Sequence, residues 1–112
     1  MNVEQQLLAE IESQLEDDIL YFAWLVQIVR QQHPAYTESE CTNTVVDVVA
    51  RLHRDGTIVV GNAREIDGMI LIDPWPESNR KLRDRMQSEI AKANIRDRDF
   101  CFWIQLTTHF AR

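Results

Sequence analysis

The fold is decided by residues 45–60, which read VVDVVARLHRDGTIVV. The valines and the leucine of this stretch fall at helical spacing and predict the buried face of a helix over residues 38–54. Gly56 ends the helix, because glycine adopts the left-handed backbone conformation that follows many helices. The β-branched residues 57–60 predict a strand that stops at Gly61. The sequence thus predicts a helix that passes through a short turn directly into a strand.

Three helices are expected up to this point. The first covers residues 3–15, where apolar side chains recur every three or four positions, at Val3, Leu7, Leu8, Ile11 and Leu15. The second covers about residues 18–32 and begins with Asp17 or Asp18 as its N-cap, unless the first helix continues through both. It is apolar nearly all round, so it is expected to be the central core helix, with Tyr21, Phe22 and Trp24 as packing residues. The third begins with Thr37 and Glu40 in the spacing of a capping box.

The later elements complete an α+β pattern. They are expected as a polar connection at residues 62–68, a strand at 69–72, a break at Asp73-Pro74, a helix at 77–94 and a last strand at 100–106. The prediction is a single domain over residues 1–112, in which N-terminal helices pack on a small antiparallel sheet. One helix is inserted between the later strands.

Two segments resemble the winged-helix family. The run Leu52-His-Arg-Asp-Gly-Thr-Ile58 resembles a recognition helix entering its first wing, and Phe102-Trp-Ile-Gln-Leu-Thr107 is similar to the strand that closes the wing. The chain departs from that pattern by the helix between the wing strands. It also lacks the proline and glycine that usually follow the closing strand. The resemblance implies a winged-helix-like architecture.

A second resemblance rests on four segments, Asp55–Gly61, Trp75-Pro76, Asp99–Trp103 and Leu106-Thr107. Together they are similar to a group of small bacterial proteins in which a Gly-Asp-Ile-Cys-Trp type segment leads the last strand. Arg98 stands where that group has the glycine. In size and acidity the chain also resembles the immunity proteins of contact-dependent and polymorphic toxin systems. This resemblance implies a protein partner and assigns no role to any residue.

Charge is distributed unevenly along the chain. Residues 1–79 carry 14 acidic and 4 basic residues, whereas residues 80–112 carry 4 acidic and 8 basic ones. An acidic surface repels nucleic-acid phosphates and attracts basic partners. The acidic part is interpreted either as a solvated face that aids solubility or as a docking face for a basic protein. The basic helix at 80–92 is interpreted as facing an acidic helix of the same or a neighbouring molecule, or as contacting nucleic acid.

Motifs for chemistry are not found in the sequence. The spacings among Cys41, Cys101, His33, His53 and His109 match no zinc module. No glycine-rich phosphate loop and no nucleophile elbow occur, so no enzyme activity, metal or cofactor is expected. The two cysteines are expected as reduced thiols of a cytoplasmic protein, because no export signal or membrane-spanning stretch is seen.

These observations favour a non-catalytic immunity-type protein that binds a basic toxin, expected to be a nuclease, and occludes its active surface. The candidate partner contacts are Glu12, Glu16, Asp17, Asp18, Glu65, Asp67, Asp73 and Trp75. For Trp75 two roles stay open, a cap on the core or an anchor for the partner. The alternative function is a winged-helix DNA-binding regulator, although acids outnumber arginines on the expected recognition helix. A third is an oligomer in which helix 80–92 of one copy meets the acidic helix of another.

Overall fold

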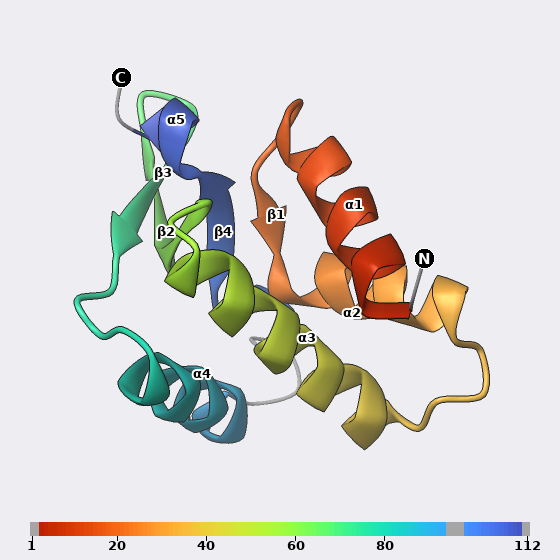
Figure 1. Ribbon diagram of the computed structural model, residues 1–112. Coiled ribbons are helices and arrows are strands. Elements are labelled where there is room, and N and C mark those ends of the chain that lie inside the picture. The colour runs from red at the N-terminus through yellow and green to blue at the C-terminus, as the bar shows by residue number, and fades with distance from the viewer. Residues whose placement is uncertain (1–2, 94–97, 111–112) are drawn as a thin grey trace.

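Helices and one antiparallel sheet make up the computed structural model, which describes residues 3–93 and 98–110. The elements follow in the order α1 (Val3–Leu15), β1 (Leu20–Tyr21), α2 (Phe22–Gln32), α3 (Glu38–Arg54), β2 (Ile58–Ile66), β3 (Met69–Pro74), α4 (Arg80–Lys92), the 3-10 turn η1 (Arg98–Phe100), β4 (Trp103–Leu106) and α5 (Thr107–Phe110) (Figure 1). The predicted α+β class and the helix inserted between the later strands are confirmed.

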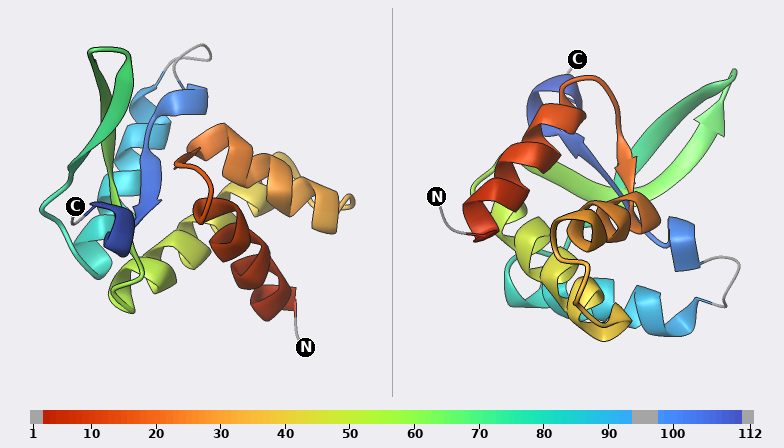
Figure 2. Two further views of the ribbon diagram at one scale, coloured as in Figure 1. Left: turned by 90° about the horizontal axis from the view of Figure 1, so that it is seen from above. Right: turned by 90° about the vertical axis from the view of Figure 1, so that its right-hand side faces the viewer.

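The sheet places its last strand in the middle. The strand order is β1-β4-β2-β3, and each neighbouring pair is antiparallel. Ile104 of β4 pairs with Leu20 on one side and with Val60 on the other. Helices α1, α2 and α3 lie on one side of the sheet, and the β2–β3 hairpin projects away from them (Figure 2).

The hydrophobic core lies between these helices and the inner face of the sheet. The four long helices each contribute an apolar side: Leu7, Ile11 and Leu15 of α1, Phe22, Leu25, Ile28 and Val29 of α2, Val45, Val46, Val48, Val49 and Leu52 of α3, and Leu82 and Met86 of α4. The periodicities that predicted α1, α3 and α4 therefore identify buried faces correctly. The side chain of Val3 and the expected helix end at Asn94 lie outside the described residues.

The local signals of α3 are confirmed. The Thr37 hydroxyl accepts a hydrogen bond from the backbone N–H of Glu40 at 3.1 Å, and the Glu40 carboxylate accepts one from the backbone N–H of Thr37 at 3.0 Å. This capping box satisfies two N–H groups that the first turn would otherwise leave unpaired. At the other end Gly56 takes a φ of 77°, as the helix-to-strand turn requires.

The beginning of the second helix was predicted wrongly. α1 ends at Leu15 and α2 starts at Phe22, so Asp17 and Asp18 lie in a connection and neither is an N-cap. The end of this connection forms β1, because Leu20 and Tyr21 find pairing partners on β4. This pairing is tertiary, and it overrides the helical pattern of the apolar run. The expectation that Trp24 is buried is also wrong, since 41% of it is exposed.

The strands after α3 are longer than expected. β2 passes through Gly61 and continues to Ile66, in place of the predicted polar connection. Asp67 and Gly68 then form a tight hairpin turn with φ values of 54° and 80°, the left-handed pair of a type I′ turn. β3 runs to Pro74, which is tolerated because β3 is an edge strand. The last strand is shorter than predicted, since residues 98–100 form η1, and α5 was not anticipated.

Candidate functional site

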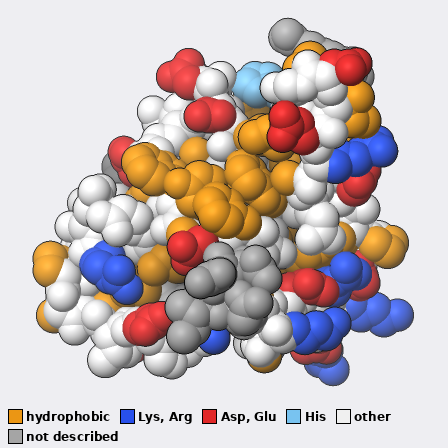
Figure 3. All heavy atoms as spheres, turned by 180° about the vertical axis from the view of Figure 1, so that it is seen from behind, with side chains coloured by type: hydrophobic (Ala, Val, Ile, Leu, Met, Phe, Trp, Pro, Cys, Tyr) orange, Lys and Arg blue, Asp and Glu red, His pale blue; other side chains and the backbone are white. Residues whose placement is uncertain are grey.

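The outer face of the sheet, opposite the helices, is the candidate binding surface. Alternation along the strands turns Leu20 and Ile104 inward, so their neighbours Tyr21 and Trp103 point outward. Ile72 is only 4% exposed, yet it does not belong to the core between the sheet and the helices. Ile72 pairs with Ala63 of β2, and alternation from the inward-facing Val60 places this pair on the outer face. Hydrophobic side chains gather on the side of the molecule that faces away from the viewer in Figure 1, with acidic side chains above them (Figure 3).

Three aromatic rings form a cluster on this face. The ring of Tyr21 lies 4.9 Å from that of Phe100 and 5.2 Å from that of Trp103, and the rings of Phe100 and Trp103 stack at 5.9 Å. Phe100 is 52% exposed although it is large and apolar. Such a cluster supplies apolar area and rigid rings, the features that anchor protein–protein interfaces.

A groove with an acidic wall lies at one end of the outer face. Its volume is about 610 Å³, and it is lined by Glu16, Asp17, Asp18, Ile19, Met69, Ile70, Gln105 and His109. The acidic wall is the connection between α1 and β1, and the apolar wall is the end of the β2–β3 hairpin. Met69 is 64% exposed and Ile70 is 48% exposed. The groove therefore offers carboxylates and uncovered apolar side chains to the same ligand.

The structure brings together three of the predicted contacts, Glu16, Asp17 and Asp18. Glu65 and Asp67 do not line the groove but belong to the hairpin that does, with Glu65 paired in register to Ile70. The remaining two carboxylates lie elsewhere. Asp73 pairs with Arg64 at 3.0 Å, and Glu12 is exposed on α1 without lining this groove.

Trp75 is a core residue and not a partner contact. It is 7% exposed, its indole N–H donates to the Asn62 side chain at 2.8 Å, and its ring meets Phe102 at 5.9 Å. The guanidinium of Arg85 lies 4.5 Å from the ring centre, which adds a cation–π contact. Of the two roles left open by the sequence, the structure shows the cap on the core, and the assignment as a partner-binding residue is wrong.

The groove carboxylates are not neutralised by the basic helix. Arg83 of α4 pairs with Asp47 of α3, and Arg85 pairs with Glu77 at 2.8 Å and Glu89 at 3.1 Å. Within residues 3–93 and 98–110, no ion pair involves the carboxylates of the acidic wall, Glu16, Asp17 and Asp18. The Asp18 carboxylate only accepts a hydrogen bond from the backbone N–H of Ile19, at 2.8 Å. These charges are therefore available to a partner.

Sequence reasoning missed the apolar half of the groove. The sequence predicts only a strand at residues 69–72, whereas the structure places Met69 and Ile70 at the exposed end of a hairpin. One sequence signal was available, because an Asp-Gly pair between two apolar runs is typical of a two-residue hairpin. Gln105 and His109 carried no such signal, since only the central position of β4 brings them to this site.

The ionisable groups elsewhere point to structure more than to reaction chemistry. Burial raises the pKa of the Cys101 thiol to about 12, so it stays protonated near neutral pH. Burial also lowers the pKa of His53. In the part of the chain that the structure describes, no three His, Cys, Asp or Glu side chains gather as a metal site, and no helix is long and apolar enough to cross a bilayer.

Comparison of the chain with known protein families, with curated proteins and with solved structures finds no match.

Proposed function

We propose that this chain is a non-catalytic binding protein of the immunity type, which acts in the cytoplasm and holds a basic protein toxin, a nuclease, at the acidic groove. One observation carries the proposal. The groove joins three carboxylates that lack an ion-pair partner in the described residues to the exposed apolar side chains of Met69 and Ile70. A surface of this kind suits a protein segment that carries both basic and apolar side chains.

The two halves of the groove contribute different terms to binding. Carboxylates attract a basic surface over a distance of about 10 Å at moderate salt, which speeds association and selects partners by charge. The exposed apolar side chains contribute burial, at about 25 cal/mol for each Å² removed from water. A nuclease binds phosphates with a basic surface, so carboxylates that occupy this surface exclude its substrate. Inhibition then follows from occlusion without any chemical step.

The test uses the product of the gene that neighbours the gene of this chain, which the proposal expects to be a basic nuclease toxin. We expect tight binding in calorimetry and loss of nuclease activity when the two proteins are mixed. The double variant Asp17→Lys/Asp18→Lys should lower the affinity about 10- to 100-fold at low salt, since each reversal replaces an attraction of up to about 1 kcal/mol by a repulsion. The difference should shrink as the salt concentration rises.

The matched control is Glu38→Lys/Asp84→Lys, which makes the same change in net charge at two exposed positions outside the groove. It should bind nearly as well as the wild-type chain. Equal losses in the two double variants would show that only net charge matters and would contradict the groove assignment. A neighbouring gene product that is not inhibited at all would contradict the proposed function itself.

A further inference from the structure

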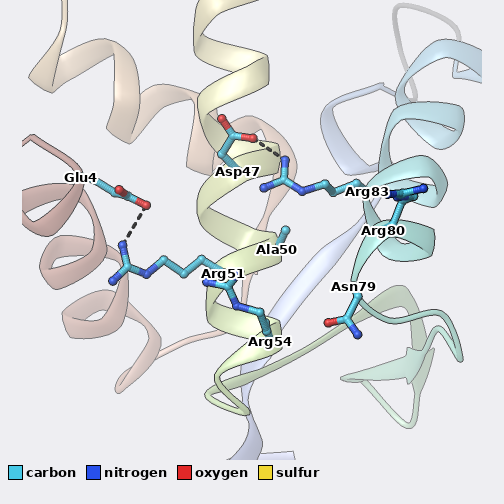
Figure 4. A pocket seen from close by; sticks show the side chains of 8 residues that line it. All are labelled: Glu4, Asp47, Ala50, Arg51, Arg54, Asn79, Arg80 and Arg83. Carbon is cyan, nitrogen blue, oxygen red and sulfur yellow. Dashed lines mark hydrogen bonds and ion pairs between the residues drawn. The ribbon is translucent and has the colours of Figure 1, made fainter.

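A second cleft lies between α3 and α4 and has the opposite chemistry. Its volume is about 620 Å³, and it is lined by Glu4, Asp47, Ala50, Arg51, Arg54, Asn79, Arg80 and Arg83 (Figure 4). The last turns of α3 supply two of the arginines and the first turn of α4 supplies the other two. Ala50 lies between the two walls, and its small side chain leaves the space between them open. The sequence singles out the basic helix at 80–92, but no spacing places its arginines beside Arg51 and Arg54 of α3.

The four arginines are only half neutralised. Arg51 pairs with Glu4 at 3.0 Å, and Arg83 pairs with Asp47. Among the residues that the structure describes, Arg54 and Arg80 have neither an ion pair nor a side-chain hydrogen bond. The cleft therefore carries two positive charges in excess, although the chain as a whole has a net charge of −6.

Fold stability explains only part of this arrangement, because Arg51 and Arg54 suit the C-terminal end of α3 whereas Arg80 and Arg83 do not suit the start of α4. Cations in the first turn of a helix oppose the helix dipole, and the first turn of α4 has no acidic residue to offset Arg80 and Arg83. Guanidinium groups that share one cleft also repel one another. Both costs are relieved when an anion lies between the two helices. Charges held at some expense of stability are typical of binding sites.

We propose that this cleft binds a phosphate group, held by Arg54 and Arg80 with support from Arg51 and Arg83. A guanidinium presents paired N–H donors that match two phosphate oxygens, and a phosphate monoester carries about −1.5 to −2 charges at pH 7, which matches the excess of two positive charges. The phosphate belongs either to a free phosphorylated small molecule or to a nucleic-acid strand, in which two neighbouring diesters with one charge each would match the same excess. The inference is independent of the acidic groove and of the partner proposed there.

The test titrates the protein with inorganic phosphate and pyrophosphate by calorimetry, and with a fluorescent DNA duplex by anisotropy. The double variant Arg54→Gln/Arg80→Gln removes the two unpaired charges of the cleft. The control Arg30→Gln/Lys81→Gln removes two exposed charges that do not line it. We expect the cleft variant to lose affinity at least about tenfold, the value of one charge-assisted hydrogen bond, and the control to keep wild-type affinity.

The three probes separate the sources of the phosphate. Specific loss of phosphate or pyrophosphate binding in the cleft variant supports a free ligand, and specific loss of duplex binding alone supports a nucleic acid. Absence of binding by every probe, or equal losses in the two double variants, would overturn the proposal. Circular dichroism of each variant checks that α3 and α4 remain folded. The variant Arg54→Lys/Arg80→Lys keeps the two charges but loses the paired N–H donors, so it should retain part of the affinity.

Discussion

Replacement of Gly61 by alanine should destabilise the protein by forcing β2 and β3 apart. A Cβ atom at this position would lie 2.7 Å from the carbonyl carbon of Asp73 and 2.9 Å from Cα of Pro74, with the Asp73 carbonyl oxygen nearer still. These neighbours are backbone atoms, so they can move only if the edge strand moves with them. Gly61 thus permits the close approach of the two strands, which is why the strand continues through it.

The size of the effect follows from the geometry. Ordinary contacts begin near 3.4 Å, so the Asp73 carbonyl oxygen, the nearest of these atoms, requires a shift of about 1.5 Å. The hydrogen bond from the Trp75 N–H to the Val60 carbonyl is 2.8 Å long and would exceed the limit of hydrogen bonding after such a shift. A weakened backbone bond costs about 1 kcal/mol, and overpacking costs about 1–3 kcal/mol. We therefore expect a loss of about 3 kcal/mol.

Urea denaturation followed by fluorescence measures this loss. With an m-value of about 1.5 kcal/mol/M, the midpoint of Gly61→Ala should fall by about 2 M. The control is Gly68→Ala, where nothing lies within 4 Å of the added carbon and the cost is only that of a φ of 80°, about 1–2 kcal/mol. If Gly61→Ala proved as stable as the wild-type chain to within about 0.5 kcal/mol, the reasoning from close strand approach would be refuted.

Three further predictions concern the caps and the titratable groups. Thr37→Ala removes one half of the capping box and should lower the free energy of unfolding by about 1 kcal/mol, measured by thermal melting, whereas Thr37→Ser should be nearly neutral. Because the pKa of Cys101 is raised, the folded state keeps a proton that the unfolded state loses above about pH 9. The free energy of unfolding should therefore fall as pH rises beyond that value, and Cys101→Ala should reduce the fall. The hydrogen bond from Arg85 lowers the pKa of Glu77 in the folded state. The stability that this pair contributes is therefore present above about pH 4.5 and is lost as pH falls through the lowered pKa of the folded state. Glu77→Gln should flatten the acid limb of a pH–stability profile.

Helices α1, α3 and α4 could be predicted from the sequence because their signals are local. The capping box at Thr37 and the valine stripe that follows it determine α3 without reference to the rest of the chain. β1 could not be predicted, since Leu20 and Tyr21 become a strand only where β4 lies beside them. The full length of β2 could not be predicted either. In the sequence Gly61 indicates the end of a strand, whereas in the fold its missing side chain lets β3 approach β2 closely.

The candidate site could be predicted only in part for the same reason. The run of three acids at residues 16–18 was visible, and its exposure follows from its position between α1 and β1. Its apolar neighbours come from a hairpin about fifty residues later in the chain. Periodicity reports only on residues within one element, so it could not predict that these two segments lie side by side. For Trp75 the sequence left open a cap on the core and an anchor for a partner, and only the packing against Phe102, a tertiary contact, shows that it caps the core.

The central position of β4 has a consequence for biosynthesis. Ile104 lies between Leu20 and Val60, so β1 has no pairing partner and β2 pairs only with β3 until residues 103–106 have left the ribosome. During translation the first helices and the β2–β3 hairpin emerge before β4, so the edges of β1 and β2 that later pair with β4 carry unpaired backbone groups. Completion of the sheet therefore waits for β4, and slow translation or a damaged β4 would leave an intermediate with exposed strand edges for chaperones to shield.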